Sequence, residues 1–243
     1  MIAGAGTLLN TSTVVVGGVV GLTAGHHIPL RVRDAAVSVL GLFTLVLGVK
    51  TAVLPNFSGA AAPDFAIVLV ALLVGTVVGA WIGITRWLER VSLLAQRRFA
   101  ATADGSTFGE AFLTTSLLFC VGPLTILGSF EDGAHGDILL LAIKSALDGV
   151  AALAFATTLG PGVLLSAITV LVTQGTLTAV AYLTRGALDP YLISQALGAG
   201  GIMLVGIGMG LLKLARLPVA DMLPALVVAP LFALLVRSLG WPI

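Results

Sequence analysis

Two ionisable residues stand four positions apart in an otherwise apolar stretch of this sequence. Lys144 and Asp148 lie within Ile143-Lys-Ser-Ala-Leu-Asp-Gly149. In a helix, residues four apart share one face, so the ammonium and the carboxylate can neutralise each other. If the stretch crosses a membrane, each charge costs about 2.5–3.5 kcal/mol or more at mid-helix, which makes it a functional candidate. We interpret Asp148 as the group that binds a cation or a proton, and Lys144 as the group that releases or replaces this bound cation or proton. The alternatives are a structural ion pair, or a Lys144 side chain that extends to the membrane interface.

Uncharged polar residues in two other apolar stretches could belong to the same site. Asn10 to Thr13 form a polar cluster near the N-terminus, and a second set begins at Ser166. Their hydroxyl and amide groups could coordinate a dehydrated cation, or could simply hydrogen-bond helices to each other. The residues predicted to line a substrate or ion pathway are Asp148, Lys144, Ser145, Asn10, Thr13, Ser166, Thr169 and Gln174.

A short acidic segment follows the middle of the chain. Glu131, Asp132 and Asp137 lie close to His135 and could attract a cation, as an outer acidic entrance to the pathway. A hydrated acidic loop explains them equally well, and their spacing matches no metal-ligand pattern. The sequence also has no Walker A loop, no His-Glu-x-x-His and no Gly-x-Ser-x-Gly motif. We therefore predict no enzyme activity, no catalytic residues, no metal and no cofactor.

The elements that hold these residues follow from composition. Charged residues make up 9% of the 243 residues and hydrophobic residues 58%, whereas a soluble domain carries roughly 25% charged residues. So few polar groups cannot cover a soluble protein of this size, but a bilayer solvates apolar side chains. The net charge of +1 gives no indication of a nucleic-acid partner, and the single cysteine, Cys120, excludes an internal disulfide.

The fold class predicted is all-α, a polytopic transmembrane helix bundle, because apolar runs of about 20 residues span the hydrocarbon core. The fourth run contains Gly122-Pro123, so it could be kinked or re-entrant, which would leave seven spans plus a re-entrant segment. The first run contains no Lys or Arg, and we interpret it as a retained helix and not a signal peptide. The eight candidate helices are 6–23, 35–54, 65–84, 108–128, 138–158, 162–183, 192–213 and 222–239.

Basic residues between these helices predict the orientation of a single transmembrane domain, 1–243. Eight lie in the loops of one side and three in those of the other, which places the first side in the cytoplasm and both termini outside. The cytoplasmic segment 85–107 contains a basic amphipathic stretch that could lie on the inner membrane surface. The two sets are Arg31, Arg33, Arg86, Arg90, Arg97, Arg98, Lys213 and Arg216, against Lys50, Arg185 and Arg237.

An internal repeat is a further prediction. Gly6-Thr-Leu-Leu-Asn-Thr-Ser-Thr-Val-Val-Val16 aligns with Gly162-Val-Leu-Leu-Ser-Ala-Ile-Thr-Val-Leu-Val172, and Gly41/Gly48 have the spacing of Gly201/Gly208. The repeat units would be 6–84 and 162–239. Their first helices are five helices apart, which is an odd number, so the two units would cross the membrane in opposite directions. Inverted repeats are typical of secondary transporters, although apolar sequences also match by chance.

Several stretches carry a family resemblance. They are the segment Leu118–Gly133, Lys144-Ser-Ala-Leu-Asp-Gly149, Gln174-Gly175 and Met222-Leu-Pro-Ala-Leu-Val-Val-Ala-Pro230. With these residues the chain resembles the bacterial membrane family known as domain of unknown function 554, the YqgA/YdfK-like proteins. The resemblance implies a multi-pass protein of the bacterial inner membrane, and it implies no substrate.

Two functional hypotheses follow. The first is a small secondary transporter or ion pathway, cation- or proton-linked, that works in the lipid bilayer on a small ion or solute as a homo-oligomer. The second is a non-transporting membrane scaffold or sensor, which acts through the cytoplasmic segment 85–107. Flux assays on Asp148 variants and deletion of 85–107 discriminate between them.

Overall fold

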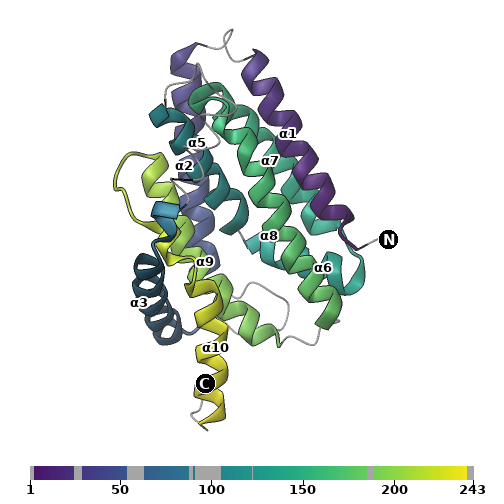
Figure 1. The fold of residues 1–243 in the computed structure, drawn as a ribbon, viewed down its shortest axis with the longest axis vertical. Coiled ribbons are helices and arrows are strands. Elements are labelled where there is room, and N and C mark those ends of the chain that lie inside the picture. The colour runs from purple at the N-terminus through teal and green to yellow at the C-terminus, as the bar shows by residue number, and fades with distance from the viewer. Residues whose placement is uncertain are drawn as a thin grey trace. The chain divides into compact units, whose positions relative to one another are not determined.

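The computed structural model describes residues 3–24, 29–53, 63–87, 90, 105–121, 123–184 and 189–239. Within these ranges the regular structure is helical, and no strand occurs. The fold class predicted from composition is confirmed. The elements are α1 (Ala5–Ala24), α2 (Leu30–Val53), α3 (Phe65–Ile82), α5 (Gly105–Val121), α6 (Pro123–His135), α7 (Leu139–Leu159), α8 (Gly162–Thr184), α9 (Pro190–Leu211), η2 (Val219–Met222) and α10 (Ala225–Ser238), traced in Figure 1.

Local sequence signals place several helix ends. Asp64 precedes α3, and its carboxylate accepts from the backbone N–H groups of Ala66 and Ile67, which satisfies donors that a helix start leaves unpaired. Gly83 ends the same helix at φ 77°, a left-handed conformation that glycine adopts without steric cost. Asp189 caps α9 in the same way, with Pro190 at the first helical position.

Six stretches are long and apolar enough to cross a membrane: α1, α3, α7, α8, α9 and Val219–Ser238. A seventh is counted if Phe108–Val121 and Leu124–His135 form one span, although they are bent by 54° at the break between them. A bend therefore separates α5, which ends at Val121, from α6, which begins at Pro123, in the run where the sequence predicts a kink or a re-entrant segment. The apolar part of α2, Val37–Val53, is shorter, because Arg31, Arg33 and Asp34 occupy the start of that helix. Of the eight predicted segments, six or seven are long and apolar enough to cross a membrane within the described part of the chain.

The outer faces of these helices are apolar. Val77, Trp81, Val150 and Leu183 are each at least 69% exposed. On α7 the exposed side chains are apolar, whereas the buried ones include Lys144 and Asp148. A soluble helix shows the opposite arrangement, so lipid is the solvent that fits this surface.

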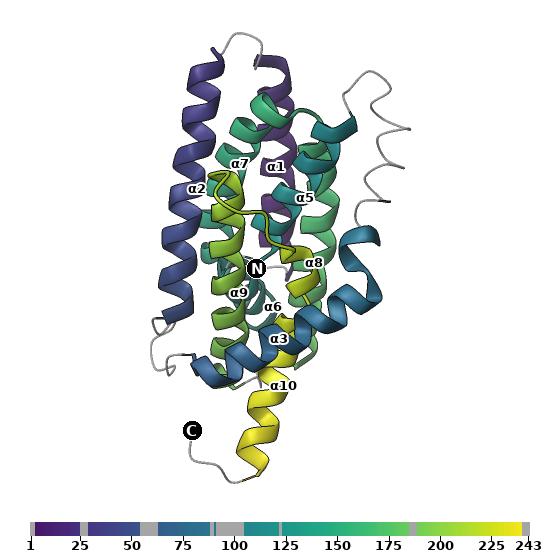
Figure 2. The ribbon, with the colours of Figure 1, turned by 90° about the vertical axis from the view of Figure 1, so that its left-hand side faces the viewer.

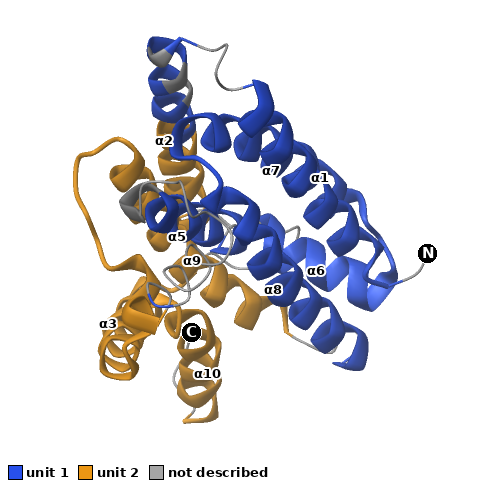
Figure 3. Cartoon of the chain, turned by 45° about the horizontal axis from the view of Figure 1, so that its top comes forward, with its two compact units in different colours: residues 1–40, 88–186 blue, residues 41–87, 187–243 orange. Residues whose placement is uncertain are grey.

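Contacts within the chain divide it into two compact units (Figure 3). Unit 1 comprises residues 1–40 and 88–186, and unit 2 comprises residues 41–87 and 187–243. Unit 1 contains α1, α5, α6, α7 and α8, which carry all the predicted site residues.

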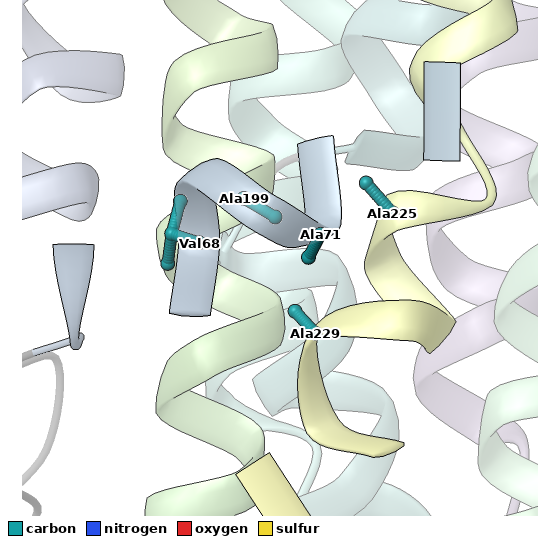
Figure 4. Packing of buried hydrophobic residues seen from close by; sticks show 5 residues of the cluster. All are labelled: Val68, Ala71, Ala199, Ala225 and Ala229. Atoms are coloured by element: carbon teal, nitrogen blue, oxygen red, sulfur yellow. The ribbon is translucent and has the colours of Figure 1, made fainter. Parts of the chain in front are cut away.

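Unit 2 is built on close approaches between α2, α3, α9 and α10. A Cβ on Gly48 would lie 2.7 Å from the Gly201 carbonyl oxygen, and one on Gly208 would lie 2.9 Å from that of Gly41. Small residues at such crossings let membrane helices pack closely. Figure 2 shows α3 crossing α10. A small apolar cluster, drawn in Figure 4, joins these two helices to α9: Val68, Ala71, Ala199, Ala225 and Ala229.

The helices that the predicted repeat makes equivalent pack against each other in pairs. Within unit 1, α1 packs on α8, and within unit 2, α2 packs on α9 and α3 on α10. Each pair is antiparallel: Thr7 meets Thr178 while Gly18 meets Leu164 in the first pair. This pairing is what an inverted repeat would produce, and the repeat itself stays a prediction.

Part of the predicted cytoplasmic region is beyond what the structure describes. Residues 88, 89 and 91–104 of the amphipathic segment lie outside the described residues, including Arg97 and Arg98. Arg185, on the predicted outer side, also lies outside them. The surface role of that segment and the orientation of the chain stay predictions.

Candidate functional site

The centre of the candidate site lies near the middle of α7. Asp148 is 7% exposed and Lys144 is 4% exposed. The Lys144 ammonium donates to Asp148 Oδ2, one helical turn away. The pair predicted from the spacing is therefore formed, and Lys144 does not extend to a helix end.

Close packing of α1 on α7 brings a third group to the pair. Asn10 is fully buried and its Nδ2 donates to Asp148 Oδ2 at 2.9 Å. Two glycines of α1 make this approach possible. A Cβ on Gly17 would lie 2.1 Å from the carbonyl oxygen of Gly149, and one on Gly21 would lie 2.4 Å from that of Leu153. Figure 1 shows the two helices side by side. The glycine spacing is the small-xxx-small pattern of helix contacts in lipid.

The break between α5 and α6 adjoins the same pair. The ring of Phe119, near the end of α5, has its centroid 5.9 Å from Lys144 Nζ. An ammonium over an aromatic face is attracted by the ring quadrupole. Beyond the break, Thr125 turns its hydroxyl back to the Phe119 carbonyl oxygen at 2.8 Å. The C-terminal end of α5, which carries a partial negative charge, therefore lies close to the buried Lys144 ammonium.

From α8, Gln174 faces the same interior. Gln174 is fully buried, one turn before Thr178, whose hydroxyl lies 3.3 Å from that of Thr7. Because α1 and α8 are antiparallel, one turn along each helix from that contact places Gln174 at the level of Asn10. The Gln174 amide has no hydrogen-bond partner at either its oxygen or its nitrogen.

The other predicted pathway residues lie in this unit, with their hydroxyls bonded to backbone. Ser145 donates to Leu141 O at 2.6 Å, Ser166 to Val163 O at 2.6 Å, and Thr13 to Asn10 O at 2.9 Å. Thr169 bonds the hydroxyl of Ser116 at 2.9 Å, which links α8 to α5. These contacts fit interhelical and intrahelical hydrogen bonding. The hydroxyl oxygens keep acceptor lone pairs, and the role of these residues in the pathway stays a prediction.

Of the predicted acidic entrance, Glu131 and Asp132 lie in α6, whereas Asp137 lies between α6 and α7, and all three carboxylates contact other groups of the protein. Asp132 is 0% exposed and its two oxygens accept from the backbone N–H groups of Gly4 and Gly6, each at 3.1 Å. It thus caps the start of α1 from α6. Glu131 contacts His135 at 2.8 Å, and Asp137 accepts from Leu139 N at 2.9 Å. Their role as an entrance stays a prediction.

Over the described residues, no group of three or more His, Cys, Asp or Glu side chains could hold a metal ion. The candidate oxygen ligands of the site are those of the Asn10 and Gln174 amides and of the single Asp148 carboxylate. Such a set suits hard, weakly bound cations and protons better than transition metals.

Residues 5–234 match the family model described as Protein of unknown function (DUF554). The chain belongs to this family. It is 31% identical over 235 residues to "Uncharacterized protein YqgA" of Escherichia coli (strain K12), covering 92% of this chain and 94% of that protein. It is 26% identical over 237 residues to "Uncharacterized membrane protein YdfK" of Bacillus subtilis (strain 168), covering 97% and 98%. No solved structure gives a significant match. The family resemblance is confirmed, and the chain is a membrane protein with several apolar helices.

In this DUF554 member, sequence reasoning missed three residues of the site region. Phe119 lies against Lys144, Ser116 bonds Thr169, and Thr178 sets the register of α1 on α8. Thr178 could have been found, because it follows Gln174 by one turn and shares its helix face. Phe119 and Ser116 carry no local signal, since apolar and hydroxyl residues occur throughout the membrane segments.

Proposed function

We propose that this protein is a small secondary transporter or ion pathway of the bacterial inner membrane, with Asp148 as the group that binds the transported or coupling cation or proton. The observation that carries the proposal is the buried Lys144–Asp148 pair at mid-helix, joined by Asn10 and placed beside a helix break. Ionisable groups at that depth are rare and costly. Broken helices beside polar groups are a recurrent feature of transporter binding sites.

The chemistry of the pair suits exchange. When Lys144 holds the carboxylate, the pair is neutral and the site excludes other cations. A proton or cation that binds Asp148 replaces that ammonium, because two positive charges on one buried carboxylate would leave an uncompensated charge in a medium of low dielectric constant. Lys144 must then lose a proton or move toward the membrane interface. Binding of a cation or proton to Asp148 is thereby coupled to proton release from Lys144 or to movement of its side chain.

With this function we propose that both termini lie outside and that the chain works as a homo-oligomer. The antiparallel pairing of α1 with α8, α2 with α9 and α3 with α10 supports an inverted repeat. A transporter of this kind would expose its site alternately to the two sides of the membrane.

Flux through proteoliposomes tests the proposal. Purified wild type is reconstituted, and fluxes of H⁺, Na⁺, K⁺ and Li⁺ are recorded under imposed gradients, next to Asp148→Asn and Glu110→Gln. Glu110 is exposed in α5 and belongs to neither the predicted pathway nor its entrance, so it is a matched carboxylate control. We expect wild type and Glu110→Gln to conduct at least one ion and Asp148→Asn to lose that flux. Equal traces for wild type and Asp148→Asn with every ion would refute the transport function.

A further inference from the structure

Two buried amide side chains in unit 1 carry polar atoms that no protein group satisfies. Asn10 Oδ1, Gln174 Oε1 and Gln174 Nε2 are buried without a hydrogen-bond partner. Both residues are 0% exposed. Burying an unpaired amide is unfavourable, and most buried polar groups in proteins are paired. Three such atoms at one level of the bundle therefore indicate a ligand.

The hydrogen bonds fix which Asn10 atom is free. Asn10 Nδ2 donates to the Asp148 carboxylate at 2.9 Å, and a carboxylate can only accept such a bond. The amide orientation is thus decided by chemistry, and Oδ1 is the free atom. Both amide atoms of Gln174 lack a partner. No hydrogen bond therefore fixes the orientation of this amide, and its oxygen is free to face the site.

Register places these atoms beside the ion pair. The Thr7–Thr178 contact at 3.3 Å sets α1 against α8, and one turn from it along each helix are Asn10 and Gln174. Asn10 already touches Asp148. The register therefore puts Gln174 of α8 at the level of the Asn10–Asp148 contact between α1 and α7.

This donor set selects the class of ligand. Two amide oxygens and one carboxylate are hard oxygen ligands, which suit hard cations and offer little to an anion. Ca²⁺ takes six to eight oxygens and Mg²⁺ requires near-octahedral geometry, and a single carboxylate shared with Lys144 cannot balance a double charge. A monovalent cation matches both the ligands and the charge.

We propose that Asn10 Oδ1, Gln174 Oε1 and the Asp148 carboxylate bind a dehydrated monovalent cation, which competes with the Lys144 ammonium for the carboxylate. This inference rests on the proposed function, because it assigns the ion of the same site. Gln174 Nε2 remains to donate to a water molecule at the site. Na⁺ is the probe for the test.

Binding in detergent solution tests the site separately from transport. Binding of ²²Na⁺ to purified protein and its thermal stability are measured in NaCl, KCl and choline chloride at constant ionic strength. The variants are Gln174→Leu and the control Thr176→Val, which lies on the exposed face of α8. We expect wild type and the control to bind Na⁺ or K⁺ and to be stabilised by it. Gln174→Leu should fold and weaken that binding roughly tenfold or more, because it removes one of the three proposed oxygen ligands, and tenfold corresponds to about 1.4 kcal/mol of binding free energy.

Four outcomes are decisive. Wild type that responds equally to Na⁺, K⁺ and choline would overturn the cation site, and the amides would then bind water. Unchanged binding in Gln174→Leu would overturn it as well. If flux persists although no Na⁺ or K⁺ binds, the proposed function holds with protons as the ion, and this cation site is wrong. Cation binding without flux retains the site and removes the transport function.

Discussion

The buried ion pair allows stability and transport to be separated by a double-mutant cycle. Lys144→Met removes the ammonium with little change in volume, Asp148→Asn removes the charge of the carboxylate, and the double variant removes both. Lys144 and Asp148 are 4% and 7% exposed, so each single variant leaves a desolvated charge without its partner. Breaking a buried pair from one side costs about 3–5 kcal/mol.

The double variant should recover most of that loss. With both charges gone, no uncompensated charge remains, and the amide oxygen of the asparagine that replaces Asp148 can still accept from Asn10. We expect Lys144→Met/Asp148→Asn to unfold within about 1–2 kcal/mol of wild type, because neutral replacement of buried pairs is often nearly neutral. The two single costs would otherwise sum to about 6–10 kcal/mol.

The assay combines unfolding by denaturant in mixed micelles with ion flux in proteoliposomes. The double variant should be folded and stable and yet carry no flux. If it is stable and transports like wild type, the pair only fixes packing, and the functional argument is wrong. If instead the single costs simply add, the two groups are not coupled in the folded protein, and the geometry of the site is wrong.

Three other perturbations test the structure around the site. Asp132→Ala removes both hydrogen bonds to the start of α1 and should lower the free energy of unfolding by about 3–6 kcal/mol, at roughly 1.5–3 kcal/mol per bond to a charged group, with Asp132→Asn losing less. Gly17→Ala places a Cβ 2.1 Å from the Gly149 carbonyl oxygen and should cost about 1–3 kcal/mol or more, with flux falling because Asn10 moves from Asp148; unchanged flux and stability would contradict the close packing. The backbone N–H of Tyr191 and, after it, the Arg237 guanidinium lower the pKa of Asp189. Asp189 therefore makes a small, solvent-screened contribution to stability. This contribution is present above the pKa of Asp189 in the unfolded chain and is lost as the pH falls through its pKa in the folded protein. Arg237→Gln should therefore reduce the loss of stability between neutral and acidic pH, and an identical pH profile would contradict the contact.

The sequence by itself determined the helices, their membrane environment and the ion pair. Long apolar runs, caps such as Asp64 and Asp189, and the break at Gly122-Pro123 are local properties of the chain. The Lys144–Asp148 contact is also local, because four-residue spacing puts both on one helix face. Family membership likewise followed from the residues.

Only the tertiary structure decided which groups meet. Asn10 and Asp148 are 138 positions apart, and their contact depends on how Gly17 and Gly21 let α1 approach α7. Asp132 was indistinguishable in sequence from its acidic neighbours, yet packing places it under the first N–H groups of α1. Thr13 and Gln174 looked alike as polar residues among apolar ones, but the hydroxyl reaches its own helix backbone and the amide does not. Spacing along a helix fixes the face that a side chain occupies, whereas its partner depends on the crossing of helices that are remote in sequence.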